Sequence, residues 1–402
     1  GYRHLLPVLP FFVVFIAAVL AWLADDLPQQ KRPGQLAVVG LLVWLGSSPI
    51  WLSPHYLAFF NVLAGGPDGG WRYLVDSNID WGQDLGGLKD WLAENGVDQV
   101  WLSYFGEGRP SYYNIDYVGL DSFPPRLMNP QARPFYPHDP APGIYAISVT
   151  NLQGVQFANH DQFAWFRDKE PLAKVGYSIF IYEVLPHGEP TDLVLAGMQL
   201  DEIAQQDFAR LQTNQVTPRW LSSSTAFLQP AAADFWLVAD RDFELGLAES
   251  AVSLQPIAEN DHYTLYLAQN EREQPISGTT FLQGSGQIWL LDELPMLTTQ
   301  PGILQLTTRW RNDTSPEPLK IYVHLLDEMG SIISQWDGLD VPWEGWRAGD
   351  NLWQRHELPL PPVLPPGKYL IHAGLYHPET AVRWQTAAGV DFVQVGTLEV
   401  EP

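Results

Sequence analysis

The stretch LLPVLPFFVVFIAAVLAWLA, from Leu5 to Ala24, contains no charged residue. A second apolar stretch, LAVVGLLVWLGSSPIWL, follows from Leu36 to Leu52. An α-helix rises about 1.5 Å per residue, so stretches of this length approach or reach the roughly 30 Å of a membrane's hydrocarbon core. We therefore expect a hairpin of two transmembrane helices over residues 1–53.

A short polar segment, Asp25 to Gln35, separates the two stretches and carries Lys31 and Arg32. Short loops rich in Lys and Arg stay on the cytoplasmic side, whereas acidic residues contribute little to orientation. We therefore expect a multi-pass cell-membrane protein whose residues after about 53 are extracytoplasmic. Because the chain opens with Gly1 instead of Met, we also expect a fragment whose upstream helices are missing.

Two other interpretations of the apolar stretches stay open. A cleaved signal peptide has an apolar core of roughly 7 to 15 residues and an Ala-x-Ala-like site. The first stretch is longer than that and offers only Ala21-Trp22-Leu23-Ala24. The second alternative is a pair of buried helices in a soluble protein.

The composition excludes several classes of protein. A length of 402 residues fits two or three domains at about 150 residues each. The chain has no cysteine, which excludes disulfides, cysteine-ligated zinc and thiol catalysis. The formal net charge of −24 argues against nucleic acid as a partner.

Hydrophobic periodicity predicts further domains after the helices. Residues 54–190 hold an interfacial segment and an α/β domain, residues 191–272 a small mixed α/β region, and residues 273–402 a carbohydrate-binding-like β-sandwich. In the α/β domain we expect a helix at Asp80–Asn95 and strands at Arg72–Asp76, Gln99–Phe105, Gly143–Thr150 and Gly176–Val184.

The C-terminal region has a sequence pattern typical of β-strands, separated by turns. We expect strands at Gly286–Leu291, Ile303–Trp310, Leu319–Leu326, Ser331–Trp336, Trp353–Leu358, Tyr369–Tyr376 and Val390–Val400. Such a series predicts a sandwich of two sheets. The fold class expected is a membrane-anchored α+β multidomain protein, with two transmembrane helices, an α/β extracytoplasmic domain and a C-terminal antiparallel β-sandwich.

The densest group of polar side chains is DSNIDWGQD, from Asp76 to Asp84. It resembles the opening of a calcium-binding loop, yet the places for Gly and Glu hold Trp81 and Gly87, which excludes an EF-hand. A looser divalent-cation site stays open, and no cofactor is certain. The candidate substrate- or metal-binding residues are Asp76, Asn78, Asp80 and Asp84.

The same residues also have a structural interpretation. Asp80 and Gln83 have the spacing of a capping box, in which side chains bond backbone N–H groups at a helix start. Asp84 would then lie in the first turns, where the helix dipole favours negative charge. Asp76 and Asn78 would be freer, because crevices at the carboxyl ends of strands commonly bind ligands.

Three tryptophans, Trp343, Trp346 and Trp353, are candidates for a platform on which a sugar ring stacks. Packing in a hydrophobic core is the alternative for each of them. The ten histidines show no spacing typical of a metal site.

Four segments carry a resemblance to a known family. They are YRHLLPVLP (Tyr2–Pro10), FNVLAGGP (Phe60–Pro67), DSNIDWGQDLGGL (Asp76–Leu88) and PLAKVGYSIFIYEV (Pro171–Val184). Together they resemble the C-terminal part of bacterial dolichyl-phosphate-mannose–protein mannosyltransferase-like membrane glycosyltransferases, within the glycosyltransferase C superfamily. The resemblance covers residues 1–187.

The resemblance implies transfer of a sugar from a polyprenyl-phosphate carrier to a glycan or protein acceptor. The catalytic acid of that family lies upstream of this chain, so no catalytic residue is carried over. Arg3 matches the Arg of the family's Arg-Tyr-Leu-Leu-Pro pattern, with His4 in place of Tyr, which implies contact with the carrier phosphate. Its alternative role is ordinary snorkelling at the membrane surface.

We therefore expect the C-terminal portion of a hexosyl-transferring glycosyltransferase, in which this fragment positions carrier and acceptor. Its partners would be membrane lipid, the polyprenyl-phosphate-linked sugar and a glycan or protein acceptor. The alternative is a non-enzymatic, membrane-anchored extracytoplasmic module that binds a glycan or a partner protein. A calcium-stabilised adhesion protein is the third interpretation.

Overall fold

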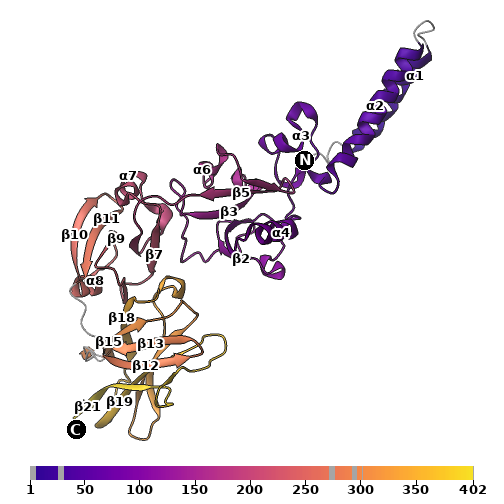
Figure 1. Cartoon of the computed structure of the whole chain (residues 1–402). Coiled ribbons are helices and arrows are strands. Elements are labelled where there is room, and N and C mark those ends of the chain that lie inside the picture. Colours follow the sequence, from indigo (N-terminus) through magenta and orange to yellow (C-terminus); the bar gives the residue numbers. More distant parts are fainter. Residues whose placement is uncertain (1–5, 26–30, 271–276, 292–296, 301, 402) are drawn as a thin grey trace. The chain divides into compact units, whose positions relative to one another are not determined.

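The computed structural model describes residues 6–25, 31–270, 277–291, 297–300 and 302–401 (Figure 1). The chain divides into two compact units. The first unit comprises Gly1–Met128 with Gly143–Val184, and the second Asn129–Pro142 with Leu185–Pro402. In the described residues, the strands form four sheets.

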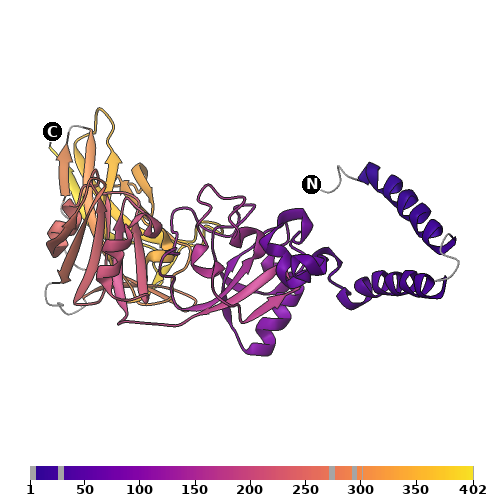
Figure 2. The same cartoon turned by 90° about the horizontal axis from the view of Figure 1, so that it is seen from above.

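Two helices, α1 (Leu9–Asp25) and α2 (Lys31–Leu52), form a hairpin near the N-terminus (Figure 2). A 3-10 helix, η2 (Leu6–Val8), precedes α1. None of the helices in the described ranges combines the length and the apolar character that a membrane crossing requires.

The expected pair of transmembrane helices is therefore wrong, and so are the membrane-anchored fold class and the multi-pass localisation with extracytoplasmic domains. The first apolar stretch is not one continuous α-helix. Its α-helical part, α1, has 17 residues, which at about 1.5 Å per residue is shorter than a hydrocarbon core of about 30 Å. The longer helix α2 opens on Lys31 and Arg32, and it includes Ser47 and Ser48.

Short helices connect α2 to the first sheet. They are η3 (Tyr56–Ala58), η4 (Val62–Ala64), α3 (Gly66–Gly69), η5 (Gly70–Arg72) and η6 (Asp76–Asn78). The strand expected at Arg72–Asp76 is wrong, because η5 runs to Arg72, Tyr73 keeps a helical backbone conformation and η6 begins at Asp76. The following helix begins at Leu85, five residues later than expected, as α4 (Leu85–Asn95).

The first sheet has the strand order β2-β1-β3-β5-β4. Its strands are β1 (Gln99–Ser103), β2 (Asp116–Gly119), β3 (Gly143–Ser148), β4 (Ala173–Val175) and β5 (Ile179–Val184). Its shorter helices are η7 (Pro110–Tyr113), α5 (Val149–Leu152) and α6 (Ala164–Arg167). Because β1 runs parallel to both β2 and β3, the carboxyl ends of these three strands meet at one edge.

Helix α4 is held against this sheet by its apolar side. Leu85 and Leu88 are buried in one cluster with Val100, Leu102 and Ile181 of the strands. This packing places the loop before α4, which contains Asp76–Asp84, next to the sheet.

The second sheet has the order β10-β11-β9-β6-β7. Its strands are β6 (Thr191–Ala196), β7 (Val216–Leu221), β9 (Asp234–Asp240), β10 (Val252–Glu259) and β11 (Tyr263–Asn270). Its helical turns are η8 (Leu200–Glu202), α7 (Gln205–Phe208), η9 (Ala209–Leu211) and α8 (Gly246–Ala251).

The first and second sheets share one topology. If the strands of each sheet are numbered along the chain, both have the order 2-1-3-5-4. In both, the first strand is parallel to its two neighbours and the remaining pairs are antiparallel. In both, helical turns connect the first strand to the second and a helical segment leads from the third strand to the fourth. The chain therefore contains a structural repeat that its sequence did not indicate.

Two further sheets pack face to face as a β-sandwich. One has the order β20-β12-β13-β15-β18-β8, with β14 paired to β15, and the other β17-β16-β19-β21. Their strands are β8 (Ala226–Gln229), β12 (Gly278–Gln283), β13 (Gly286–Leu291), β14 (Leu297–Gln300), β15 (Ile303–Asn312), β16 (Lys320–Leu326), β17 (Ile332–Gly338), β18 (Asn351–Pro359), β19 (Gly367–Tyr376), β20 (Gln385–Thr386) and β21 (Val393–Val400).

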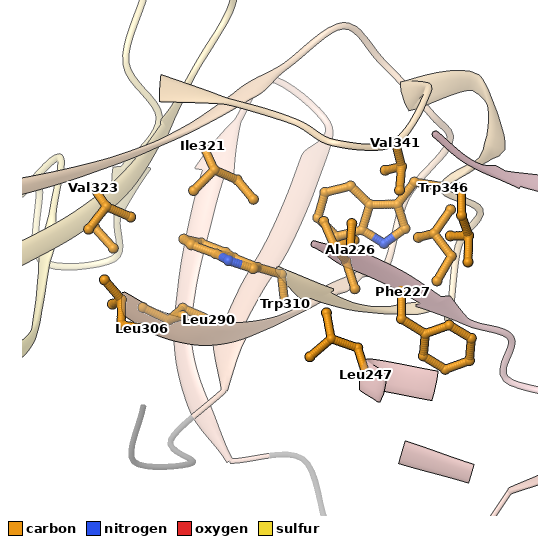
Figure 3. Packing of buried hydrophobic residues seen from close by; sticks show 14 of the residues in the cluster. Ala226, Phe227, Leu247, Leu290, Leu306, Trp310, Ile321, Val323, Val341 and Trp346 are labelled. Atoms are coloured by element: carbon orange, nitrogen blue, oxygen red, sulfur yellow. The ribbon is translucent and has the colours of Figure 1, made fainter. Parts of the chain in front are cut away.

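The sandwich core contains side chains from both sheets. Figure 3 shows Trp310 and Leu306 of β15 near Ile321 and Val323 of β16, and all four are buried. Along β15, alternate residues are buried, as expected for a strand with one face on a core. Strand β8, which lies before residue 273, also joins this core through Phe227.

A buried ion cluster connects the second sheet to the sandwich. Arg219 of β7 donates to both carboxylate oxygens of Asp350, at 2.7 and 2.9 Å, and to Asp192 of β6 at 2.7 Å. Asp350 precedes β18 and is fully inaccessible. The cluster shows why the second sheet and the sandwich belong to one compact unit.

Candidate functional site

The carboxyl edge of the first sheet brings part of the DSNIDWGQD segment to the ends of β1 and β3. The backbone N–H of Asp76 donates to Thr150 Oγ1 at 3.0 Å, just after β3. Asp80 is completely buried there, and its Oδ1 accepts the Gly82 N–H at 3.0 Å. Its Oδ2 has no hydrogen-bond partner among the described residues.

Burial raises the pKa of Asp80 to about 7. Interactions with the Gly82 N–H and with Thr150 offset the effect of burial only in part, and the charge of Asp84 raises the pKa further. A carboxyl with a pKa near neutrality is present both with and without its proton at physiological pH. Such groups concentrate at functional sites, because a proton donor or acceptor works best when its pKa lies near the working pH.

Asp84 is held by hydrogen bonds, but it lies just before the helix and not in its first turns as expected. Its Oδ2 accepts the Ser178 hydroxyl at 2.6 Å and the Gln83 side-chain amide at 3.0 Å. It occupies the N-cap position of α4, yet its side chain makes no capping hydrogen bond. The capping-box hypothesis for Asp80 and Gln83 is therefore wrong, since α4 begins after both residues.

The other two candidates are bonded within their own loop or to a neighbour. Asp76 accepts the Ser77 N–H at 2.6 Å and the Gln156 side-chain amide at 3.2 Å. Asn78 donates to Val75 O at 3.0 Å. Across the part of the chain that the structure describes, no three His, Asp or Glu side chains come together as metal ligands would.

Sequence reasoning missed two members of this site. Asn151 of α5 is fully buried, donates to Ser103 Oγ at 3.0 Å, and has an Oδ1 without a partner among the described residues. Tyr104, directly after β1, donates its hydroxyl to Gly82 O at 2.6 Å. Burial, together with the charge of Asp80, raises the Tyr104 pKa to about 12. Neither residue stands in a recognisable motif, so only the parallel strands reveal them.

The three candidate sugar-stacking tryptophans lie in different environments. Trp346 is buried in the sandwich core (Figure 3) and donates to Asp350 O at 3.2 Å. The ring of Trp353 is covered by the Arg309 guanidinium, 4.9 Å from its centroid, and its Nε1 donates to Gln229 at 3.0 Å. Trp343, in η10 (Trp343–Gly345), is half-buried and lines a groove.

This groove of the sandwich is shallow and encloses no cavity. It combines an aromatic ring with hydroxyl, amide and carboxylate groups. Its lining residues are Ile288, Asn312, Thr314, Ser315, Pro316, Glu317, Leu319, Trp343 and Trp346.

Glu317 is the ionisable group of the groove. Its Oε1 is buried without a hydrogen-bond partner among the described residues. Burial raises the pKa of Glu317, and the nearby His377 opposes that effect. A Cβ at Gly286 would lie 2.3 Å from this oxygen, so only glycine leaves room for it. Arg3, the candidate for contact with a carrier phosphate, lies outside the described residues.

Comparisons with known proteins do not identify the chain. No protein-family model matches it, and no curated protein matches it. Among solved structures, a calcium-binding mutant of Bacteroides uniformis beta-glucuronidase 2 is 14% identical with a TM-score of 0.18, over 31% of this chain and 15% of that one. Parabacteroides merdae beta-glucuronidase is 16% identical with a TM-score of 0.18, over 35% and 16% of the two chains.

An endonuclease/exonuclease/phosphatase from Beutenbergia cavernae is also 16% identical, with a TM-score of 0.16, over 37% of this chain and 33% of that one. This chain therefore spans a third or less of the length of these three proteins. TM-scores this low carry no argument about fold or function.

Proposed function

We propose that this chain recognises a saccharide, which binds on the surface across the shallow groove beside Trp343. The observation that carries the proposal is the composition of that groove, in which an indole lies beside polar side chains. Aromatic rings bury the apolar face of a sugar ring, while hydroxyl, amide and carboxylate groups bond its hydroxyls.

The polar side chains of the groove differ in whether their hydrogen-bonding atoms already have partners within the protein. Asn312 donates to Trp346 O at 2.8 Å and accepts from the Thr314 N–H at 3.0 Å. These hydrogen bonds hold the Asn312 side chain in place within the groove. Glu317 retains an unpaired acceptor, and the Ser315 side chain is exposed. The proposal therefore assigns ligand binding to Glu317 and Ser315, and stacking to Trp343.

The resemblance of residues 1–187 to glycosyltransferases supports a role for this saccharide as the acceptor of a transferred sugar. In that reaction an acceptor hydroxyl oxygen forms a bond to the anomeric carbon of the donor, while the bond to the carrier phosphate breaks and the hydroxyl proton leaves. This chain would position the acceptor. A module that only binds glycans would show the same binding without a transfer step.

Isothermal titration of the full chain with glucose, mannose, galactose and N-acetylglucosamine tests the proposal. Glu317→Gln keeps the shape of the side chain and removes its charge. Because hydrogen bonds to charged groups are the stronger ones, we expect the Kd of the bound sugar to rise about tenfold. Glu399→Gln, on an exposed side chain of β21, is the matched control and should bind as the unaltered chain does.

Two results would contradict the groove as the binding site. One is that none of the four sugars binds, and the other is that Glu317→Gln binds with unchanged affinity. Thermal melting of each variant shows whether the substitution has left the fold intact.

A further inference from the structure

Two histidines lie opposite each other on the smaller sheet of the sandwich. His324 of β16 and His372 of β19 are direct partners in the antiparallel pairing of these strands. Their chain neighbours Val323, Leu325 and Ile371 point into the sandwich core, so both imidazoles project from the other face of the sheet. Residues directly opposite each other in an antiparallel pair have Cβ atoms about 4.5–5.5 Å apart, and two imidazoles at that spacing can reach one ion.

The ring nitrogens of this pair are not used within the protein. Neither His324 nor His372 makes a hydrogen bond among the described residues, and their nitrogens are not among the buried side-chain atoms that lack a partner. The nitrogens therefore reach solvent, although His324 is only 9% exposed and His372 is half-buried. Each histidine can thus offer a nitrogen to a ligand from outside without giving up a bond of the fold.

Aromatic neighbours hold both imidazole rings in place. The His372 ring stacks on that of Phe392, with 4.0 Å between centroids and 10° between the ring planes. The Tyr322 ring lies 4.7 Å from that of His324, and the Tyr322 hydroxyl donates to Asp391 O at 2.6 Å. A metal ion binds an imidazole nitrogen in the plane of the ring, so contacts with the face of the ring leave the nitrogen available. Because the rings are already ordered, binding costs little conformational entropy.

The charges around the pair favour a bound cation over a bound proton. Burial lowers the pKa of both histidines, and the neighbouring His324 lowers the pKa of His372 further. Both rings are therefore neutral at pH 7, which is the form that binds metal ions. The exposed Asp337 of β17 places a negative charge near His324. The charge of Asp391 is offset by Arg383, whose Nη1 lies 2.8 Å from it.

We propose that His324 and His372 together bind one divalent transition-metal ion, Cu²⁺ more tightly than Zn²⁺. Imidazole nitrogen suits both of these ions, of which Cu²⁺ generally binds more tightly, whereas Mg²⁺ and Ca²⁺ prefer oxygen ligands. No third His, Asp or Glu of the described ranges completes the ligand set, so water fills the remaining positions. The ion links β16 to β19. No residue of the groove takes part, so this site does not rest on the proposed function.

Calorimetric titration of the full-length chain with Cu²⁺ and with Zn²⁺ tests the site. His324→Gln and His372→Gln each leave a single imidazole, so the Kd of the most tightly bound Cu²⁺ should rise at least tenfold in either variant. Because the two residues form one site, the double variant should bind little more weakly than each single variant. His262→Gln, which removes an exposed imidazole before β11, is the matched control and should leave this Kd unchanged.

A second measurement does not depend on whether the variants fold. Electron paramagnetic resonance of the unaltered chain, loaded with less than one equivalent of Cu²⁺, should show coupling of the copper to two imidazole nitrogens. The proposal is overturned if this copper couples to fewer than two imidazole nitrogens, or if the double variant binds Cu²⁺ as tightly as the unaltered chain. Thermal melting without metal shows whether each variant has kept the fold.

Discussion

His356 shows how a single buried side chain makes the sandwich sensitive to pH. It is fully inaccessible, its Nε2 lies 2.7 Å from Thr308 Oγ1, and its ring meets that of Trp336 at 4.4 Å between centroids. Burial lowers the pKa of His356 to about 3. The folded protein therefore keeps this imidazole neutral at pH values where the unfolded chain binds a proton.

The direction of the pH effect follows from that difference. Below the ordinary histidine pKa of 6.5 the unfolded state gains a proton that the folded state does not, so folding stability falls as the pH falls. Between pH 6.5 and 5 we expect a loss of about 2 kcal/mol, at roughly 1.4 kcal/mol per pH unit. The free energy of unfolding, determined in urea at several pH values, measures this loss of stability. His356→Gln should lack this loss, while the exposed control His262→Gln should keep it; an unchanged slope in His356→Gln would refute the assignment.

At the scale of an element, the turn between β4 and β5 packs closely against the Asp84 carboxylate of the first sheet's candidate site. Gly176 has a φ of 58°, and a Cβ there would lie 2.0 Å from the Asp84 carboxyl carbon. Asp84 in turn accepts a hydrogen bond from Ser178, the residue directly before β5. The hairpin and the loop before α4 are therefore coupled through one close approach.

Gly176→Ala should displace Asp84 and lower the free energy of unfolding by about 2–4 kcal/mol, from backbone strain together with a lost charged hydrogen bond. Gly284→Ala is the matched control. Gly284 has the same φ of 58° but nothing within 4 Å of the added Cβ, so only the strain of about 1–2 kcal/mol should appear. Equal losses in the two variants, measured by urea unfolding, would show that the contact with Asp84 is unimportant.

At the scale of the whole molecule, the division into two compact units predicts two unfolding transitions. The second sheet and the sandwich should unfold together, because the Arg219–Asp350–Asp192 cluster and strand β8 join them. Arg219→Met leaves the buried Asp350 charge without its partner, which typically costs 3–5 kcal/mol.

Differential scanning calorimetry should therefore show one transition lowered by roughly 10 °C in Arg219→Met and the other unchanged. Arg241→Met removes an exposed pair with Glu259 and should shift either transition by less than about 2 °C. A single transition that moves as a whole would mean that the two units unfold cooperatively.

Local patterns predicted much of the β-structure. The strand at Gly286–Leu291 has the bounds expected, and those at Gln99, Ile303 and Tyr369 differ by a few residues at their ends. A strand can be recognised from the sequence because the alternation of its buried and exposed residues involves only residues that are close together in the chain. The prediction of a transmembrane pair was wrong, because an apolar run does not specify where a helix begins: the run starts at Leu5, whereas α1 starts at Leu9.

The sequence by itself determined the β-rich C-terminal region and singled out the polar segment from Asp76 to Asp84, because both are continuous in the chain, although it assigned the ends of that segment to a strand and a helix. Only the tertiary structure decided that two sheets repeat one topology and that Asn151 lies at the edge that buries Asp80. It likewise decided that Trp346 is buried in the sandwich core, whereas Trp343 is only half-buried at the groove that both residues line. Strand order and burial arise from contacts between residues distant in the chain, and no local period encodes them.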